Sequence, residues 1–212
     1  RGAWFESDMA VSSQHPVSPV PNMPPGALVC VVDDDESIRK GLARLFLSAR
    51  VPVETFASAR AYLARPAHDA PSCLVLDVQM PGIDGLELQQ ALADRGEQIV
   101  FITAHGDVPM CAGAMKAGAV DFLTKPFEEE SLFVAVARAL ERSAEIRRTI
   151  AERSQARVRV ETLTPREIEV MRGVVAGLLN KQIADRLGAA EKTIKIHRSR
   201  VMAKMGVASV AD

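Results

Sequence analysis

The fold of this chain is decided by the stretch Cys73-Leu-Val-Leu-Asp77-Val-Gln-Met-Pro81-Gly-Ile-Asp-Gly85. The apolar run before Asp77 is typical of a short strand that is buried on both faces. Pro81 and the glycine after it end regular structure, and a helix is expected to begin near Asp84. Because ligands bind at the carboxyl ends of strands in open α/β sheets, Asp77 is placed for chemistry. Taken alone, the pattern fits an aspartate that merely caps a loop equally well.

Strand-like and helix-like patterns alternate on both sides of this stretch. Short apolar runs predict strands at 28–32, 53–56, 73–76, 99–103 and 120–124. Amphipathic patterns predict helices between them, at 37–50, 58–63, 84–94 and 108–117. Such an alternation predicts a doubly wound, five-stranded parallel sheet with helices on both faces. Right-handed crossovers then bring the carboxyl ends of all the strands to one edge.

Chemically active side chains follow three other strands of the predicted sheet. Asp33 and Asp34 follow the first strand, Thr103 ends the fourth, and Lys125 follows the fifth. With Asp77, the two aspartates form an oxygen-rich pocket suited to Mg²⁺, which takes one or two carboxylates and keeps several waters. A cation, an ammonium group and a hydroxyl beside an aspartate are what an aspartyl-phosphate requires. Each residue also has an ordinary structural reading, but their arrival at one edge favours phosphoryl chemistry.

Residues 27–127 resemble the receiver domain of two-component response regulators. The motifs that carry the resemblance are Val32-Asp33-Asp34, Leu76-Asp77 with Met80-Pro81-Gly82, Thr103-Ala104 and Lys125-Pro126-Phe127. The resemblance implies strand order 2-1-3-4-5, a cis peptide before Pro126, and phosphorylation of Asp77 by a histidine kinase.

The same resemblance implies a metal site and a switch. It places Mg²⁺ on Asp34, Asp77 and the backbone carbonyl of Gln79, with Asp33 acting through water. It also implies that the ring of Phe122 turns inward when Thr103 is drawn toward the phosphate.

Four further residues carry hypotheses with open alternatives. Gln79 and His105 follow Asp77 and Thr103 by two residues, at the path by which water reaches the phosphate. We hypothesise that both slow hydrolysis of the phosphate; alternatively, they are solvent-facing loop residues. Lys116 and Asp121 are candidates for a dimer interface of the phosphorylated receiver, or else a solvated surface pair.

The segments on either side of this domain differ in character. Residues 1–26 combine five prolines with polar residues, which predicts a disordered or extended tail, and the missing initiator Met suggests an added or processed start. Residues 128–161 predict a long helix that continues the last helix of the receiver. Its first half has an apolar face, but beyond it Ile146 and Ile150 are too few to predict a coiled coil.

Residues 162–212 predict three helices. Leu163-Thr164-Pro165-Arg166-Glu167 is a strong helix start with a capping box, for a helix that runs to about Gly177. Helices at 180–187 and 191–205 follow, joined by a turn at Gly188. Short helices joined by a tight glycine turn are typical of a helix-turn-helix, although the pattern alone is weak evidence.

The last predicted helix has two different faces. Ile194, Val201 and Met205 share one direction and form its core stripe. The outward side chains are those of Lys195, Ile196 and Ser199, flanked by Arg198 and Arg200 as candidate phosphate contacts. An outward Ile196 fits contact with a thymine methyl group; the alternative is an ordinary solvated face with one stray isoleucine.

This segment resembles the NarL/FixJ (LuxR-type) DNA-binding module. The resemblance rests on the helix start above, on Gly177-Leu-Leu-Asn-Lys181-Gln-Ile-Ala184 and on Thr193-Ile-Lys-Ile-His197. It implies that Lys195, Ile196 and Ser199 enter the major groove, while Lys181, Thr193 and Arg198 hold the DNA backbone. Ala190 stands where the family often has a capping Ser or Thr, and Asp212 lies near the start of the family's fourth, dimerising helix.

Composition and charge exclude several other classes of protein. No apolar run approaches the roughly 18–20 residues of a membrane span, so we expect a cytoplasmic protein without a membrane partner. The three cysteines are too few for a disulfide framework or a zinc site, and Cys111 is the candidate reactive thiol. Residues 27–127 carry 9 Lys and Arg against 13 Asp and Glu, whereas residues 162–212 carry 9 against 5. This asymmetry suits phosphate or metal chemistry first and a polyanion last.

Together these patterns predict a transcription regulator rather than an enzyme, with an α/β receiver domain (27–127), a helical linker (128–161) and an all-α helix-turn-helix domain (162–212). Phosphorylation of Asp77 is expected to drive receiver rearrangement, homodimerisation and binding to double-stranded promoter DNA, with RNA polymerase as a further partner. One alternative is a phosphatase with Asp77 as nucleophile, but Gln79 stands where its second acid is needed. Another is a DNA-binding scaffold that works without phosphorylation, which leaves the acidic pocket without a role.

Overall fold

The chain folds into two compact units, the first ending at Glu145 and the second beginning at Ile146. The computed structural model describes residues 23–66, 68–104 and 106–207. Most of the predicted tail and His105 therefore lie outside the described residues. Each unit is considered separately below.

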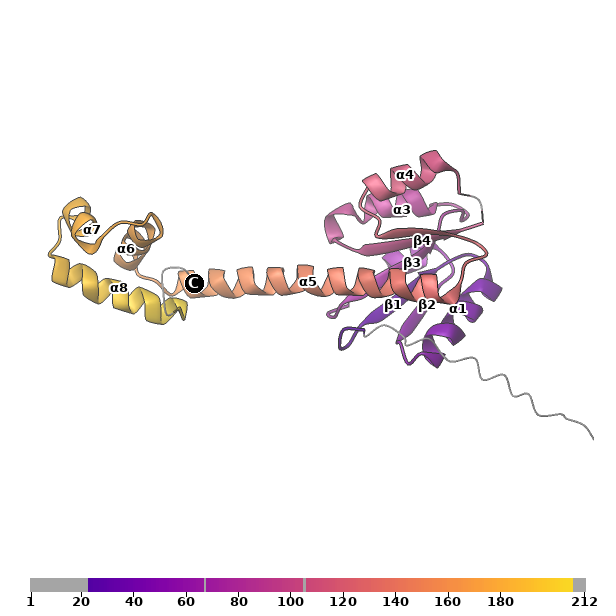
Figure 1. Ribbon diagram of the computed structural model, residues 1–212, viewed down its shortest axis with the longest axis horizontal. Coiled ribbons are helices and arrows are strands. Elements are labelled where there is room, and N and C mark those ends of the chain that lie inside the picture. The colour runs from indigo at the N-terminus through magenta and orange to yellow at the C-terminus, as the bar shows by residue number, and fades with distance from the viewer. Residues whose placement is uncertain (1–22, 67, 105, 208–212) are drawn as a thin grey trace, which may run out of the picture. The chain divides into compact units, whose positions relative to one another are not determined.

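The first unit is built on a parallel sheet (Figure 1). Its strands are β1 (Leu28–Val32), β2 (Val53–Phe56), β3 (Ser72–Asp77), β4 (Gln98–Thr103) and β5 (Asp121–Thr124). Their spatial order is β2-β1-β3-β4-β5, and every neighbouring pair is parallel. The predicted five-stranded sheet and its strand order are confirmed. All the strand ends that carry polar side chains therefore meet at one edge.

Four helices lie between the strands, with a 3₁₀ turn after the third. They are α1 (Glu36–Ser48), α2 (Ala59–Leu63), α3 (Gly85–Ala91), the turn η1 (Ala93–Arg95) and α4 (Val108–Lys116). The prediction of one continuous helix over 84–94 is wrong, because the α-helix stops at Ala91 and tightens into η1. Gly96, at φ +67°, closes this turn in the left-handed conformation that glycine adopts without strain.

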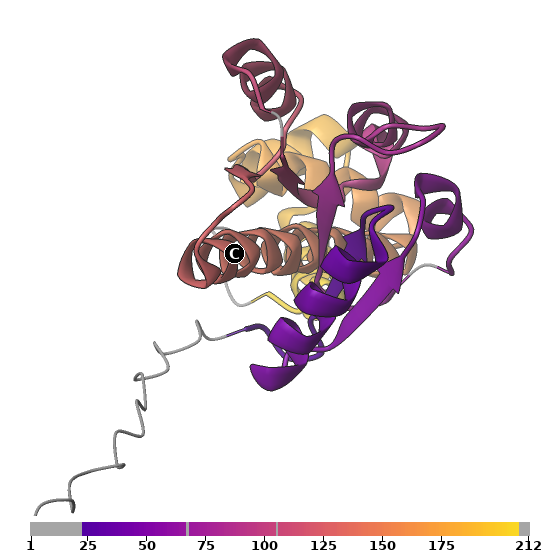
Figure 2. The ribbon, with the colours of Figure 1, turned by 90° about the vertical axis from the view of Figure 1, so that its right-hand side faces the viewer.

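Apolar side chains cover both faces of the sheet. One cluster joins strand residues such as Val29 and Val100 to helices α1 and α5 (Glu129–Glu161). The other joins Leu74 and Phe101 to helices α2, α3 and α4. Figures 1 and 2 show the strands lying between these two sets of helices. Strands buried on both faces explain the continuous apolar runs in the sequence.

Helix α5 begins at Glu129 and runs to Glu161. Its buried residues end at Ser143, whose hydroxyl accepts a hydrogen bond from the Ser72 backbone N–H at 3.1 Å. This contact joins the helix to the start of β3. Among the described residues, no helix is long and apolar enough to span a membrane.

The second unit contains the three predicted helices. They are α6 (Pro165–Val175), α7 (Asn180–Leu187) and α8 (Glu191–Met205). Val170, Val174, Ile183, Ala184 and Ile194 form their shared core. A β-carbon at Gly173 would lie 2.8 Å from Ile183 Cγ1, so a glycine is needed where α6 and α7 cross.

The helix ends in this unit follow the sequence signals. Thr164 and Glu167 form the predicted capping box at the start of α6, and Gly188, at φ +59°, ends α7. Helix α6 ends at Val175, two residues before the predicted end at Gly177. Ala190 precedes α8 in an extended conformation, and no described side chain caps that helix start.

Candidate functional site

Four strand ends deliver polar side chains to one edge of the sheet. Asp33 follows β1, Asp77 ends β3, Thr103 ends β4, and Lys125 follows β5. Three of them are buried, with exposed fractions of 1% for Asp33, 6% for Asp77 and 0% for Thr103. Burial of two carboxylates is unfavourable unless cations or hydrogen-bond donors surround them.

Lys125 supplies the cation for both carboxylates. Its Nζ donates hydrogen bonds to Asp33 Oδ2 at 2.8 Å and to Asp77 Oδ1 at 2.9 Å. The peptide bond between Lys125 and Pro126 is cis, as the resemblance to receiver domains implies. The structure thus brings Asp33, Asp77 and Lys125 together, although they are far apart in the sequence.

Backbone groups complete the surroundings of the two carboxylates. The Asp35 N–H donates to Asp33 Oδ1, and the Gln79 N–H donates to Asp77 Oδ2, each at 2.9 Å. Gly85, at the start of α3, lies against the Asp77 backbone: a β-carbon there would come within 2.3 Å of the Asp77 carbonyl oxygen. Only a glycine at this position lets α3 approach the strand end so closely.

The proton affinities reflect this crowding. Burial raises the pKa of Asp77, the hydrogen bond and charge of Lys125 lower it, and the charge of Asp33 raises it; the balance lies above the usual value. Burial alone would lower the pKa of Lys125, but its hydrogen bonds to Asp33 and Asp77 outweigh burial, and the pKa is raised. One ammonium group between two carboxylates leaves an excess of negative charge.

The residues next to this pair provide oxygen donors. Asp34 and Gln79 are exposed and line a cavity of about 550 Å³, together with apolar side chains that include Met80 and Met110. Among the described residues, no three His, Cys, Asp or Glu side chains form a ready-made metal site. Mg²⁺ is usually bound by one or two carboxylates and several waters, so the carboxylates of Asp34 and Asp77 are suitable ligands for it.

Thr103 and Phe122 lie close together beside this edge. A β-carbon built on Gly106 would lie 3.3 Å from Thr103 Cγ2 and 2.8 Å from Phe122 Cε1. The Phe122 ring is half-buried and tilted against Phe101, with ring centroids 5.9 Å apart. The second predicted residue on the water path, His105, lies outside the described residues.

Arg39 and Gly106 are residues of this region to which sequence reasoning assigned no role. Arg39 Nη1, from helix α1, donates to the backbone oxygen of Asp33 at 2.7 Å. Helical spacing would pair Arg39 with Asp35, four residues before it, whereas Arg39 contacts the Asp33 backbone, so the sequence carries no signal for this contact. Gly106 likewise carries no signal, since its role depends on how the loop after β4 is folded.

In the second unit, the predicted base-reading residues share an exposed face of α8. Lys195, Ile196 and Ser199 are exposed, and Ile196 is 47% accessible although it is apolar. On the opposite side, Ile194 and Val201 are buried at 0% and 3%. The two faces are therefore arranged as the helical periodicity predicts.

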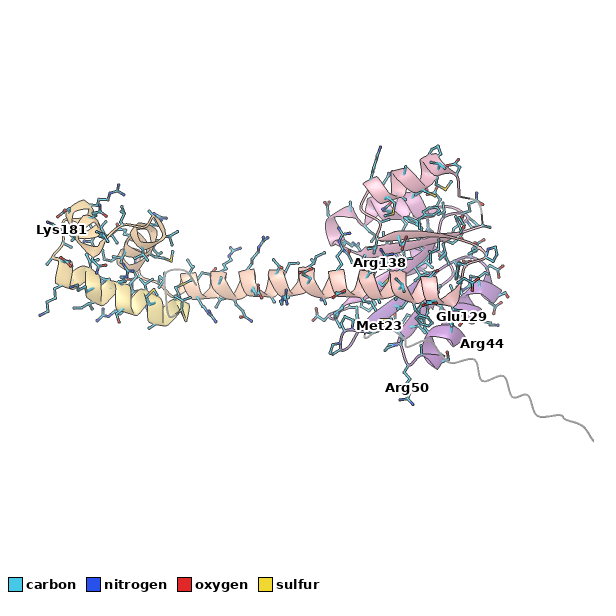
Figure 3. The ribbon with its side chains drawn as sticks, in the orientation of Figure 1. Met23, Arg44, Arg50, Glu129, Arg138 and Lys181 are labelled. Atoms are coloured by element: carbon cyan, nitrogen blue, oxygen red, sulfur yellow. The ribbon has the colours of Figure 1, made fainter. Side chains whose placement is uncertain are left out.

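The predicted backbone contacts flank this face on α7 and α8. Lys181, Thr193 and Arg200 are exposed, and Lys181 is labelled on α7 in Figure 3. Arg198 is only half-exposed, and its Nη1 donates to Asn180 Oδ1 at 3.1 Å. Arg198 therefore ties α8 to the first residue of α7.

The thiols are separate from both sites. Cys30 and Cys73 are buried in the sheet, Cys111 is half-buried in α4, and all three are free in the described part of the chain. Burial raises the pKa of the Cys30 thiol to about 12. The two sheet cysteines are therefore protonated at neutral pH and act as small apolar residues.

Comparison with known families identifies both units. Residues 29–137 match the response regulator receiver domain, and residues 161–212 match the luxR family of bacterial regulatory proteins. The receiver match implies a histidine kinase as partner, and the luxR match implies binding to DNA. The combination of the two domains is that of a response regulator transcription factor and not of an enzyme, so the phosphatase reading is set aside.

Full-length relatives show the same combination. The chain is 50% identical to nodulation protein W of Bradyrhizobium diazoefficiens over 88% of this chain and 83% of that protein. It is 42% identical to the transcriptional regulatory protein FixJ of Azorhizobium caulinodans, over 90% and 91% of the two chains. The solved structure of the response regulator StyR matches with a TM-score of 0.78 and 48% identity, over 87% of this chain and 94% of that chain.

Both units and their order along the chain agree with these relatives. The chain therefore belongs to the two-component response regulators that join a receiver domain to a LuxR-type helix-turn-helix domain and regulate transcription, as FixJ does.

Proposed function

We propose that Asp77 accepts a phosphoryl group from the phosphohistidine of a sensor kinase. A carboxylate oxygen of Asp77 attacks phosphorus, the bond between phosphorus and the imidazole nitrogen breaks, and the histidine leaves with the electron pair of that bond. The observation that carries the proposal is the position of Lys125, whose Nζ lies 2.9 Å from Asp77 Oδ1 and 2.8 Å from Asp33 Oδ2.

Lys125 and Thr103 then hold the product. The Lys125 ammonium group is close enough to Asp77 to neutralise a phosphoryl oxygen attached there. The Thr103 hydroxyl, fixed at the end of β4, donates a hydrogen bond to a second oxygen in this proposal. Removing the ammonium group should leave phosphoryl charge unbalanced, and removing the hydroxyl should leave one phosphoryl oxygen without its hydrogen bond, so either change should destabilise the phosphoprotein.

The metal in this proposal is Mg²⁺. Asp34, Asp77 and the backbone carbonyl of Gln79 would bind it, and Asp33 would act through a water. When bound, it supplies positive charge for the phosphoryl oxygens. In support, Asp34 and Gln79 line the same cavity, and Asp77 is joined to the Gln79 N–H.

Gln79 and His105 retain their proposed influence on hydrolysis. In support for Gln79, this residue is exposed at the cavity and its backbone N–H donates to Asp77 Oδ2. A comparison of phosphorylated lifetimes in Gln79→Ala and His105→Ala tests the two separately. An unchanged lifetime removes the residue concerned from the account.

We propose that phosphorylation promotes dimerisation of the receiver through helix α4 and strand β5. Lys116 and Val108 of α4 are exposed, with Val108 81% accessible, and Asp121 pairs with Arg138 of α5. Arg138 is labelled on α5 in Figure 3. Exposed apolar area on α4, together with charged groups on α4 and β5, suits the core and the polar rim of an interface formed by two copies.

We propose that the paired output units bind promoter DNA in the cytoplasm, with RNA polymerase as a later partner. Lys195, Ile196 and Ser199 would contact bases in the major groove. The phosphate contacts would come from the flanking positions Lys181, Thr193, Arg198 and Arg200. Arg198 is already held by Asn180, so its contact would be pre-positioned.

A labelling experiment tests the phosphorylation step. Full-length protein is incubated with radiolabelled acetyl phosphate and Mg²⁺, and the wild type is compared with Asp77→Asn and with Asp94→Asn, which alters an exposed acid that does not line the cavity. We expect label on the wild type and Asp94→Asn, and none on Asp77→Asn. Equal labelling of Asp77→Asn would show that another residue accepts the phosphoryl group.

A further inference from the structure

Gly106 leaves a space that the ring of Phe122 occupies. A β-carbon at position 106 would lie 2.8 Å from Phe122 Cε1 and 3.3 Å from Phe122 Cζ. Real β-carbons essentially never approach another heavy atom to less than 3.0 Å. An alanine at this position therefore excludes the ring from its present place.

The requirement for glycine at this position is steric, because contact with the Phe122 ring is enough to exclude a β-carbon there. Gly41, an exposed residue of helix α1, has no positive φ, and a β-carbon there would meet no described atom within 4 Å. The two positions thus differ in what a methyl group would touch.

The space beside Gly106 is bordered by both residues of the implied switch, Thr103 and Phe122. The same β-carbon would lie 3.3 Å from Thr103 Cγ2, so Thr103 and Phe122 both border it. Thr103 is fully buried, and Phe122 packs against Phe101 and the apolar cluster beneath α3 and α4. The Phe122 ring therefore occupies its packed position next to Thr103 only because residue 106 has no β-carbon.

We propose that Gly106 is a positioning residue of the switch and that it provides the clearance for the packed position of Phe122, which we assign to the inward state of the switch. This inference rests on the proposed function, in which Asp77 is phosphorylated, together with the switch of Thr103 and Phe122 that the resemblance to receiver domains implies. A methyl group at 106 displaces the far end of the Phe122 side chain, and rotation about its two torsions relieves the clash. The fold and the acidic pocket remain intact, whereas the inward state becomes less populated.

The test places 4-fluorophenylalanine at position 122 of the full-length chain and records its fluorine resonance. Wild type, Gly106→Ala and the matched control Gly41→Ala, which lies outside the proposed dimer interface, are compared before and after acetyl phosphate and Mg²⁺. Phosphorylation of Asp77 is measured separately by intact mass, and dimerisation by sedimentation velocity in unlabelled protein.

We expect all three proteins to be phosphorylated to a similar extent. In Gly106→Ala the fluorine resonance should move toward that of a solvent-exposed ring, and phosphorylation-dependent dimerisation should weaken by roughly tenfold, within the usual range of coupling between sites. Gly41→Ala should resemble the wild type. In a Phe122→Leu background, which lacks the clashing ring atoms, Gly106→Ala should have no further effect on dimerisation.

Two outcomes overturn the inference. One is a Gly106→Ala protein that is phosphorylated, keeps the packed resonance and dimerises as the wild type does. The other is an effect of Gly106→Ala that persists unchanged in Phe122→Leu. Loss of phosphorylation in the wild type itself would instead refute the proposed function, so the two failures are distinguishable.

Discussion

At the scale of single residues, the two buried carboxylates at the edge of the sheet lower the stability of the folded protein. Asp33 and Asp77 are buried side by side with only Lys125 between them. Burial and the charge of Asp33 raise the pKa of Asp77, which means that its ionised form is unfavourable in the folded protein. Such strain is common where a protein keeps charged groups for chemistry.

Neutralising Asp77 should therefore stabilise the chain in the absence of divalent metal. We expect Asp77→Asn to raise the free energy of unfolding at pH 7 by about 1 kcal/mol, because one ammonium group then faces one carboxylate. Urea unfolding in EDTA measures this, with Asp94→Asn as a control for the loss of an exposed acid. A lower stability of Asp77→Asn would contradict the excess of negative charge.

Glu167 is a third buried carboxylate, and unlike Asp77 it has a lowered pKa. Its Oε2 accepts hydrogen bonds from Lys204 Nζ at 2.7 Å and from the Thr164 N–H at 2.9 Å. These contacts, Lys204 first, lower the pKa of Glu167 from 4.5 to about 2. Because the pKa is depressed in the folded state, the stabilisation is present above pH 4.5 and is lost as the pH falls toward 2.

Glu167→Gln should consequently lower stability most at neutral pH. We expect the difference in urea midpoint between wild type and Glu167→Gln to narrow steadily as the pH falls from about 5 to about 3. Glu169→Gln, which removes an exposed acid of the same helix, serves as the control. A difference that stays constant over this range would show that the lost contact is not electrostatic.

At the scale of whole elements, helix α8 begins without help from a side chain. Ala190 has the extended backbone of a capping residue, φ −69° and ψ 141°, and no described side chain accepts the first N–H groups of the helix. Ala190→Ser should supply that acceptor and raise the free energy of unfolding by about 0.5–2 kcal/mol. Thermal unfolding checks this gain; a neutral or destabilising Ala190→Ser would mean that the N–H groups already have partners.

Within the second unit, hydrogen bonds connect the C-terminal end of α5 with that of α8. Arg159 Nη1 donates to the Met205 backbone oxygen at 2.8 Å, and Lys204 Nζ donates to the Thr162 backbone oxygen at 2.9 Å. A cation beside the last carbonyls of a helix is favourable. The final turn of the proposed DNA-reading helix is therefore joined to the end of α5.

Removing this joint should loosen the last turn of α8. We expect Arg159→Ala to cost about 0.5–1 kcal/mol and to speed hydrogen exchange of the amides in that turn. Arg157→Ala is the matched control, because Arg157 pairs only with the exposed Glu161 in the described structure. Equal exchange in the two variants would show that Arg159 does not support α8.

The elements differed in how far the sequence could predict them. The parallel sheet and helices α7 and α8 were predictable because apolar periodicity and glycine turns are local signals. The early end of α3 was not, since Leu92 stays buried through the change to a 3₁₀ turn and keeps the apolar period unbroken. Lys125 was predictable at the strand edge, whereas the roles of Gly85 and Gly106 depend on atoms that approach through tertiary folding.

At the scale of the whole molecule, the receiver part and the DNA-binding part of the chain carry net charges of opposite sign. The acidic first part of the chain holds the Asp33, Asp77 and Lys125 group, and the basic last part exposes Lys195 and Ile196 on α8. Family membership joins these parts as receiver and DNA-binding module. The central claim is that phosphorylation of Asp77 controls what α8 binds.

The most direct test of that claim is selection from a randomised pool of DNA duplexes by full-length protein. Wild type and Asp77→Asn are each used with and without acetyl phosphate and Mg²⁺, and retained DNA is sequenced. We predict that phosphorylated wild type enriches a sequence with twofold symmetry, and that Asp77→Asn does not. Enrichment of the same sequence by Asp77→Asn, with the same affinity in both conditions, would contradict the account.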